Sequence, residues 1–341
     1  MHTPEASPRR TRRSSGAVTL HEVAKLAQVS AMTVSRALNT PELVSEDVRR
    51  RVADAISRTG YVPNLLAGGL ASSRSRLVAA IVPTLTGPVF LPTVAVLTEA
   101  LAERGYQLML GQSGYEGHRE DELLEAVIGR RPDGIVLTGV MHSPEGRRRL
   151  QAAGVPVVET WDLSLAPIDM LVGFSHSAVG TAVADYLRAR GRRRLAVVTG
   201  SDRRAGLRAQ GFVSAALGAG LAEPEVVTVP APTTMRSGRA AMQQLASLGL
   251  DGIFCSSDLL AMGVAAQAQV DGRVVGQDLA VVGFGDLEFA ADTVPALTTV
   301  HIDAQDIGRQ AARFIVERAE GREVGERVVD VGFRIVERAS G

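Results

Sequence analysis

The stretch VTLHEVAKLAQVSAMTVSRALN, residues 18–39, predicts two short helices joined by a tight turn. Thr19, followed three residues later by Glu22, has the capping-box pattern of a helix start. Ser30 is placed to cap a second helix over residues 31–39. The outward face of that helix carries Ser, Thr, Asn and Arg groups, which suit the major groove of DNA. Two short helices alone also fit a generic three-helix bundle with a solvated polar face.

Charge is unevenly distributed along the 341 residues. The 37 basic and 37 acidic residues cancel, yet residues 1–76 hold twelve basic and six acidic residues, so they carry +6 and the remainder −6. This asymmetry indicates a segment that binds a polyanion, attached to a body that does not. Residues 1–17 predict a disordered basic arm, which either contacts phosphates, is a solvated tail or reflects a mistaken start codon.

The composition excludes several classes of protein. With 45% hydrophobic and 22% charged residues the chain is ordinary globular protein, not collagen-like, coiled-coil or fully disordered. No apolar run reaches the ~18 residues of a membrane helix, and no secretory signal follows the N-terminal arginines. The single cysteine, Cys255, cannot form an intramolecular disulfide. We therefore expect a cytoplasmic protein, associated with the nucleoid when bound to DNA.

From residue 77 onward, short apolar runs alternate with helical stretches. Runs such as LVAAIVP, DGIVLTG, LAVVTG and LAVVGF predict parallel strands that are covered on both faces. With right-handed crossovers this is a doubly wound α/β fold, whose ligands lie beyond the carboxyl ends of the strands. About 265 residues is long for one such sheet. We therefore expect residues 77–341 to form two doubly wound subdomains.

The head stretch, with PELVSEDVRRRVADAISRTGYVPN after it, closely resembles the lactose repressor (LacI) family of bacterial transcription regulators, and the resemblance covers almost the whole chain. In that family the residues that match Ala31, Met32 and Arg36 contact base edges. Those that mainly hold phosphates match Thr19, Ser30, Thr33, Ser35 and Asn39. Because Ala31 and Met32 lack hydrogen-bonding groups, we expect Arg36 to make the direct base contact, to guanine.

Residues 18–62 would thus form a helix-turn-helix domain, and residues 63–76 match the family's hinge helix and linker. The resemblance implies DNA contacts from Asn64, Ala67 and Leu70, with Leu70 wedged between base pairs in the minor groove. Two adjacent glycines weaken so short a helix, so we expect it to fold only when two copies meet on DNA. A flexible linker would explain the glycines but not Leu70.

The resemblance implies a body like that of a periplasmic sugar-binding protein, with a ligand held between two subdomains. Phe90 matches a position that packs against the ligand. Trp161, followed by Asp162, is either a platform for sugar C–H groups or a core aromatic. Arg204 and Arg208 match the ligand-clamping arginine region, whose guanidinium binds a carboxylate bidentately; a solvated helix face is the alternative.

Further positions concern the chemistry of the ligand. Ser257 matches a residue that touches ligand hydroxyls, whereas Asp258 can equally cap the next helix, the role that we favour. Gly285 replaces the first of two acids found in many family members and leaves Asp286, and the loss of a carboxylate suits an anionic ligand. His142 either binds the ligand or is solvated. Similarity to the gluconate-repressor branch completes the hypothesis of gluconate or a related aldonate.

We therefore expect a repressor that binds a palindromic operator as a homodimer and is released by a sugar acid, with corepression as the alternative mode. A dimer is expected because no leucine-heptad tail precedes the last residue. The alternatives are a sugar-acid binding or transport module, and an enzyme on a related fold. Cys255 lies in an apolar run, and no metal-ligand cluster or phosphate-binding glycine motif is present. We expect no catalysis, metal or cofactor.

Overall fold

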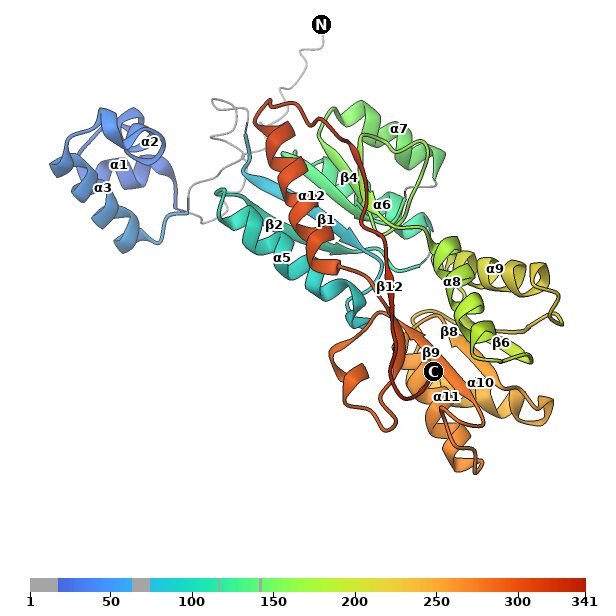
Figure 1. Ribbon diagram of the computed structural model, residues 1–341. Coiled ribbons are helices and arrows are strands. Elements are labelled where there is room, and N and C mark those ends of the chain that lie inside the picture. The colour runs from blue at the N-terminus through green and yellow to red at the C-terminus, as the bar shows by residue number, and fades with distance from the viewer. Residues whose placement is uncertain (1–17, 63–73, 116, 141–142) are drawn as a thin grey trace, which may run out of the picture. The chain divides into compact units, whose positions relative to one another are not determined.

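The computed structural model describes residues 18–62, 74–115, 117–140 and 143–341 (Figure 1). Its internal contacts divide the chain into two compact units, a head within residues 1–73 and a body within residues 74–341. The predictions for the basic arm and for the hinge residues Asn64, Ala67 and Leu70 lie outside the described residues. Within the described ranges, every helix is too short or too polar to span a lipid bilayer.

The head is a small helical unit. Its elements are α1 (Leu20–Ala27), α2 (Ala31–Asn39), the 3-10 turn η1 (Pro41–Leu43) and α3 (Glu46–Thr59). Its core is formed by Val23, Ala24, Ala27, Val34, Val52 and Ala55. The predicted capping box is confirmed, because the Thr19 N–H donates to Glu22 Oε2 at 2.6 Å and the Glu22 N–H donates to Thr19 Oγ1 at 3.4 Å. That contact with Thr19 lowers the pKa of the Glu22 carboxyl.

The first subdomain of the body is built on a parallel sheet with the strand order β11-β5-β4-β3-β1-β2. Its strands are β1 (Leu77–Val82), β2 (Gln107–Gln112), β3 (Gly134–Thr138), β4 (Val157–Thr160), β5 (Met170–Gly173) and β11 (Val328–Asp330). Figure 1 shows α5 (Leu91–Ala102) and α12 (Ala304–Ala319) side by side on one face, with α6 (Gly117–Ile128) and α7 (Pro144–Ala153) on the other. Successive side chains of a strand point to opposite faces of the sheet, so Val78 packs toward α5 and Ala79 toward α6.

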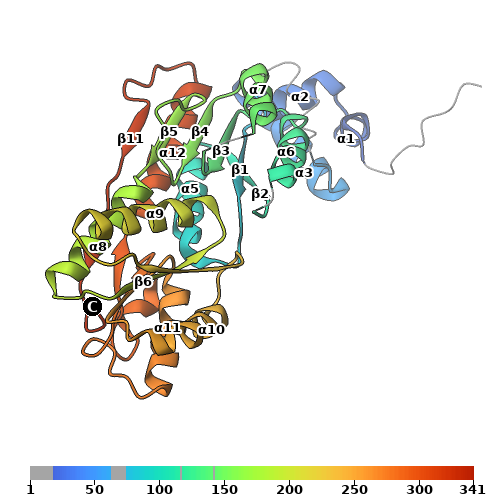
Figure 2. The same cartoon turned by 90° about the vertical axis from the view of Figure 1, so that its right-hand side faces the viewer.

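The second subdomain has a sheet with the order β12-β10-β9-β8-β6-β7, parallel except for β12. Its strands are β6 (Leu195–Gly200), β7 (Glu225–Val229), β8 (Gly252–Cys255), β9 (Ala280–Phe284), β10 (Thr298–His301) and β12 (Arg334–Val336). The helices α8 (His176–Ala189) and α9 (Arg203–Gly218) cover one face, and α10 (Met235–Leu245) and α11 (Asp258–Val270) cover the other (Figure 2).

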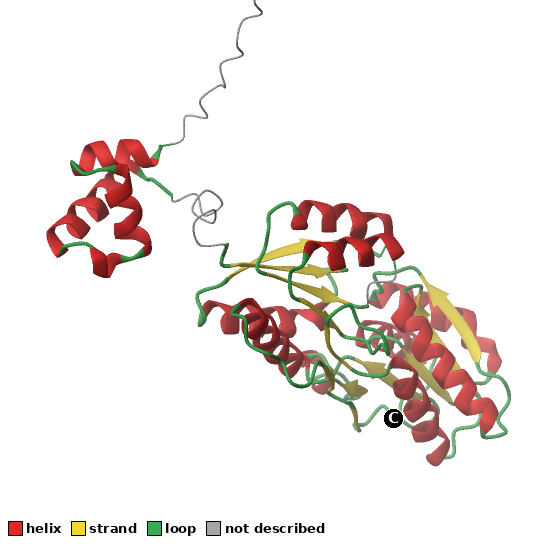
Figure 3. Cartoon of the chain, turned by 90° about the horizontal axis from the view of Figure 1, so that it is seen from above, coloured by secondary structure: helices red, strands yellow, loops and turns green. Residues whose placement is uncertain are grey.

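Three segments connect the two subdomains, because the chain leaves the first sheet after β5, returns to it after β10 and leaves it again between β11 and β12. The view coloured by secondary structure shows strands sandwiched between helices in the body and helices alone in the head (Figure 3). The predicted architecture, a helix-turn-helix head and a body of two doubly wound subdomains, is confirmed. Because helices cover both faces of each sheet, a ligand can bind only where the strands end, at their carboxyl ends.

Candidate functional site

The exposed face of α2 is the candidate DNA-binding surface of the head. The Thr33 N–H donates to Ser30 Oγ at 3.1 Å, which caps the helix as predicted. The Asn39 amide donates to the Ser35 carbonyl at 3.0 Å. Within the described part of the chain the Arg36 side chain has no hydrogen-bond or ion-pair partner, so its guanidinium is available to DNA.

The other positions predicted for base and phosphate contact lie on or beside the same face. Met32 is 65% exposed, which is unusual for a large apolar side chain, and Ala31 next to it is partly exposed. An exposed methionine on a helix that also carries Ser, Thr and Arg can contact a thymine methyl group. The residues that contact DNA remain a prediction.

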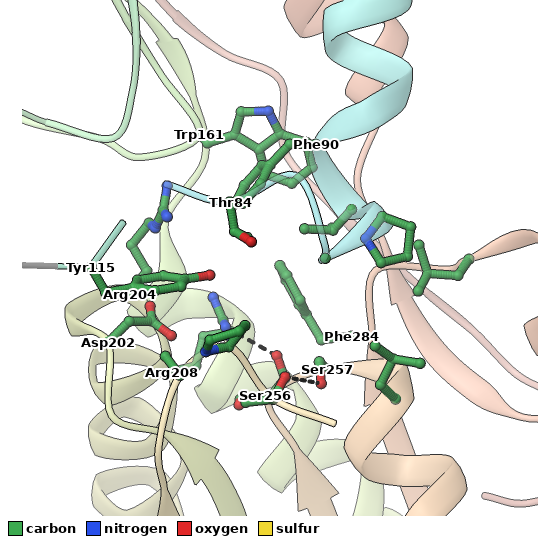
Figure 4. A pocket seen from close by; sticks show the side chains of 18 of the residues that line it. Thr84, Phe90, Tyr115, Trp161, Asp202, Arg204, Arg208, Ser256, Ser257 and Phe284 are labelled. Carbon is green, nitrogen blue, oxygen red and sulfur yellow. Dashed lines mark hydrogen bonds between the residues drawn. The ribbon is translucent and has the colours of Figure 1, made fainter. Parts of the chain in front are cut away.

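The candidate ligand site of the body is a cavity between its two sheets. Its lining comes from segments that follow the carboxyl ends of strands in both subdomains. Figure 4 shows Tyr115, Arg204, Asp202 and Arg208 gathered on one side of it, with Trp161 and Phe90 together above. The remaining polar lining is provided by Thr84, His176, Thr233, Ser256 and Ser257.

Arg208 is the central charged group of this cavity. Its side chain is only 5% exposed, its Nη1 lies 2.9 Å from His176 Nδ1, and its Nη2 donates to the Ser256 carbonyl at 3.1 Å. The guanidinium carbon lies 4.0 Å from the centre of the Phe284 ring. Burial lowers the pKa of Arg208 to about 10. Among the described residues no carboxylate forms a salt bridge with it, and its Nε is buried with no hydrogen-bond partner.

A close helix contact fixes where Arg208 stands. At Gly180 on α8, a Cβ atom would lie 1.9 Å from the backbone oxygen of Arg208 on α9. Only glycine therefore allows the two helices to approach so closely. Asp202 caps the start of α9 by accepting the Ala205 N–H at 3.1 Å, and its carboxylate lines the cavity.

Aromatic rings form another part of the cavity. Phe90 meets Trp161 edge-on with ring centroids 5.1 Å apart, and the Arg204 guanidinium lies 5.1 Å from the centre of the Phe90 ring. Arg204 Nη1 also donates to the Thr138 carbonyl at 3.2 Å, so it joins the second subdomain to the first. Trp161 is 2% exposed yet lines the cavity, and its indole N–H donates to Thr93 Oγ1 at 3.0 Å. Trp161 is therefore a core aromatic that also lines the cavity, and its contact with a sugar remains a prediction.

The structure brings five predicted ligand residues together in this cavity: Phe90, Trp161, Arg204, Arg208 and Ser257. Asp162 lines an adjoining cavity instead, where its Oδ1 accepts the Leu163 N–H and its Oδ2 lies 3.8 Å from Arg203. His142 lies outside the described residues.

Asp258 and Asp286 do not line the cavity. Asp258 is fully buried, with Thr299 Oγ1 donating to its Oδ1 at 2.5 Å and the Leu287 N–H donating to its Oδ2 at 2.8 Å. Burial raises the pKa of Asp258 to about 6. The capping role that we favoured for it is wrong, because α11 begins at Asp258 and the cap is Ser257, whose Oγ accepts the Leu260 N–H at 3.3 Å.

Asp286 is held by partners of its own. Arg338 Nη2 donates to its Oδ1 at 2.8 Å, and His301 Nδ1 lies 2.8 Å from its Oδ2. Gly285 before it has φ +128°, a conformation that side chains of L residues rarely adopt. The backbone conformation therefore explains the glycine at position 285. The absence of an acid at this position no longer supports an anionic ligand.

Sequence reasoning missed several lining residues: Thr84, Tyr115, His176, Asp202 and Phe284. Burial raises the pKa of the Tyr115 phenol. Each of these five residues lies at or shortly after the end of a strand, and that position was the available signal.

A helix-turn-helix head joined to a two-sheet body, with a cavity between the two sheets, is the architecture of a class of transcription regulators. The comparisons give the family. Residues 19–64 match the model of bacterial regulatory proteins of the lacI family, and residues 184–341 match that of the periplasmic binding protein-like domain. The chain belongs to the lacI family and is a DNA-binding transcriptional regulator, not an enzyme.

Three similar proteins illustrate the relationship. The HTH-type transcriptional regulator GntR of Pseudomonas aeruginosa is 36% identical over 332 residues, which cover 96% of this chain and 97% of that protein. GntR of Escherichia coli K12 is 33% identical, over 93% of this chain and 96% of its own. A crystal structure of a LacI-family regulator from Silicibacter pomeroyi has a TM-score of 0.89 and 31% identity, over 95% of this chain and 99% of its own.

Proposed function

We propose that the chain is a repressor whose homodimer binds a palindromic operator and releases it when the body binds gluconate or a closely related aldonate. The two heads would reach half-sites about one helical turn apart. The effector acts by binding the DNA-free state more tightly than the DNA-bound state. Such a regulator works in the bacterial cytoplasm, on the nucleoid.

The observation that carries the proposal is the buried charge of Arg208, which forms no salt bridge with a carboxylate of the described residues. A guanidinium taken out of water is destabilising unless a partner replaces its hydration. Its described contacts are a neutral imidazole, a backbone carbonyl and an aromatic ring. The lining of the cavity also holds the cation Arg204 and a single carboxylate, that of Asp202. A ligand carboxylate at Arg208 would complete the site with two charge-assisted hydrogen bonds.

The rest of the cavity suits a polyhydroxyl chain. The Ser257 and Thr233 hydroxyls lie 2.9 Å apart and can each turn toward a ligand hydroxyl. Asp202 and Tyr115 add an acceptor and a phenol on the side of the two arginines. The rings of Phe90 and Trp161 present apolar surface to C–H groups. Anion-binding and hydroxyl-binding groups in one cavity favour a sugar acid over a neutral sugar.

A calorimetric titration of the full chain with gluconate, glucose and phosphate tests this assignment. We expect gluconate to bind, and glucose and phosphate to bind at least about a hundredfold more weakly, because each lacks one of the two recognised parts. Arg208→Lys, which keeps the charge but loses the planar fork, should weaken gluconate by about tenfold or more. Equal affinities for gluconate and glucose would exclude a sugar-acid effector.

A further inference from the structure

His176 joins the two subdomains at the cavity. It is the first residue of α8 and follows the first connection between the two sheets. Its side chain is buried, with Nε2 2.9 Å from the backbone oxygen of Trp161 in the first subdomain and Nδ1 2.9 Å from Arg208 Nη1 in the second. The ring of His176 thus lies between Arg208, which would bind the effector, and the backbone of Trp161.

The partners of His176 determine its tautomer. The Trp161 carbonyl can only accept a hydrogen bond, so Nε2 carries the proton. The guanidinium of Arg208 can only donate, so Nδ1 has a free lone pair. The imidazole is therefore neutral, and a second proton would place an N–H against the N–H of Arg208.

The surroundings of His176 keep it in this form. Burial, and the positive charges of Arg208, Arg204 and Arg203, lower the pKa of the imidazole well below its ordinary value. The ring of Phe174 packs edge-on against it at 4.6 Å between centroids, and that of Phe284 lies 6.4 Å away. The contacts and the charges around His176 therefore both favour the neutral imidazole.

We propose that His176 is a positioning residue for Arg208: as a neutral acceptor it holds one edge of the guanidinium, so that the free N–H groups face the effector. The role rests on the proposed function, since it assumes a carboxylate at Arg208. His176 and Ser256 each take one N–H from the two terminal nitrogens. One further N–H on each of the two terminal nitrogens remains for a bidentate ligand.

Two substitutions separate the two contacts of His176. In His176→Asn the amide oxygen can occupy the position of Nδ1 and accept from Arg208, while the bond to Trp161 is lost. In His176→Gln the amide nitrogen can reach the position of Nε2 and donate to Trp161, while Arg208 loses its acceptor. Both variants remove the same ring, so the loss of its contacts with Phe174 and Phe284 is common to them.

We expect gluconate affinity, measured by calorimetry on the full chain, to fall about tenfold or more in His176→Gln and by no more than about threefold in His176→Asn. Melting temperatures of the free variants should be similar. Equal losses in both variants, or a larger loss in His176→Asn, would overturn the positioning role and leave His176 as packing only.

A second readout is independent of any effector. In protein with ¹⁵N-labelled histidine at about pH 7, we expect Nε2 of His176 to show the shift of a protonated nitrogen and Nδ1 that of a bare one. An Nδ1–H tautomer or an imidazolium would overturn the proposal. If the wild-type chain binds no gluconate, the proposed function fails, and these shifts alone decide the role of His176.

Discussion

The hydrogen-bond partners of polar groups are close in sequence in the head and far apart in sequence in the body. In the head, the Thr33 N–H is bound by Ser30, three residues away, at an exposed helix end. In the body, Arg208 meets His176 across 32 residues, and the contact is buried. The head thus presents exposed side chains such as Met32 and Arg36 on its surface. In the body, the side chains that line the cavity are held in place by hydrogen bonds to one another.

This difference sets the expected size of mutational effects. An exposed capping bond is worth about 1 kcal/mol. Losing one partner of a buried hydrogen-bonded charge pair costs about 2–5 kcal/mol, because the other partner stays out of water. Substitutions in the cavity should therefore cause larger free-energy changes than substitutions in the head. A substitution in the head should lower DNA affinity and leave effector affinity unchanged.

The largest effect is expected for Arg208→Met. Gluconate affinity should fall by about 4 kcal/mol, close to a thousandfold, since the carboxylate loses its buried partner. The free protein should not melt at a lower temperature, because burial already disfavours the charged guanidinium and lowers its pKa to about 10. Calorimetry and thermal unfolding measure the two quantities.

A matched control is Arg203→Met on the same helix. The Arg203 side chain is 57% exposed and lies toward the adjoining cavity, beside Asp162. This variant should keep gluconate affinity within about threefold. A comparable loss in both variants would contradict the assignment of the cavity.

The next effect concerns the buried carboxyl of Asp258, whose pKa is raised from 3.8 to about 6. The folded protein holds this proton more tightly than the unfolded chain, so the contribution of Asp258 to stability is largest below about pH 4. That contribution should fall by about 3 kcal/mol as pH rises toward about 6. Urea unfolding as a function of pH should show this contribution as the difference between the wild type and Asp258→Asn.

The exposed Asp292 provides the control for this pH dependence. Asp292→Asn should follow the wild-type curve. Both curves also contain the contribution of His176, which increases stability as pH rises because its pKa is lowered in the folded protein. If the curve of Asp258→Asn also follows that of the wild type, Asp258 is ionised in the folded protein and its burial does not raise its pKa.

Arg36→Ala tests the head, with an expected loss of about 2 kcal/mol in specific operator affinity, because one bidentate base contact disappears. Gluconate affinity should not change. Arg58→Ala removes the same charge from the last turn of α3, where Arg58 pairs with Asp54 at 3.5 Å. Gel shifts at fixed salt should show a much smaller loss for this variant, and equal losses would mean that Arg36 contributes only its charge.

The smallest effect is expected for Thr19→Ala, which removes one half of the capping box. The melting transition of the head should lose about 1 kcal/mol, and Thr19→Ser should restore most of it. Circular dichroism follows this transition. An unchanged transition in Thr19→Ala would show that the start of α1 is held by packing alone.

The same contrast explains what could be predicted from sequence. The caps at Thr19 and Ser30 follow from neighbours three residues away, so sequence was sufficient for both. The alternation of apolar runs and helices predicted both sheets, because periodicity is also a local property. In the cavity, residues such as Arg208 were found through the family resemblance rather than from a physical pattern.

What sequence could not supply was the direction of buried side chains. Asp258 turns toward Thr299, and Asp286 turns toward Arg338, 52 residues later, so neither lines the cavity. His176 does line it, because α8 begins where β5 ends and the helix points its first side chain toward Trp161. Such outcomes depend on partners that are distant in sequence.

We infer that a sugar acid bound in the body controls the affinity of the head for DNA. The direct test is fluorescence anisotropy of the full chain on a labelled duplex, selected by the chain itself from a random pool, titrated with gluconate. We predict that gluconate releases the duplex from the wild type and leaves the Arg208→Met complex intact. Unchanged or tighter DNA binding at gluconate concentrations that saturate the body would contradict the account.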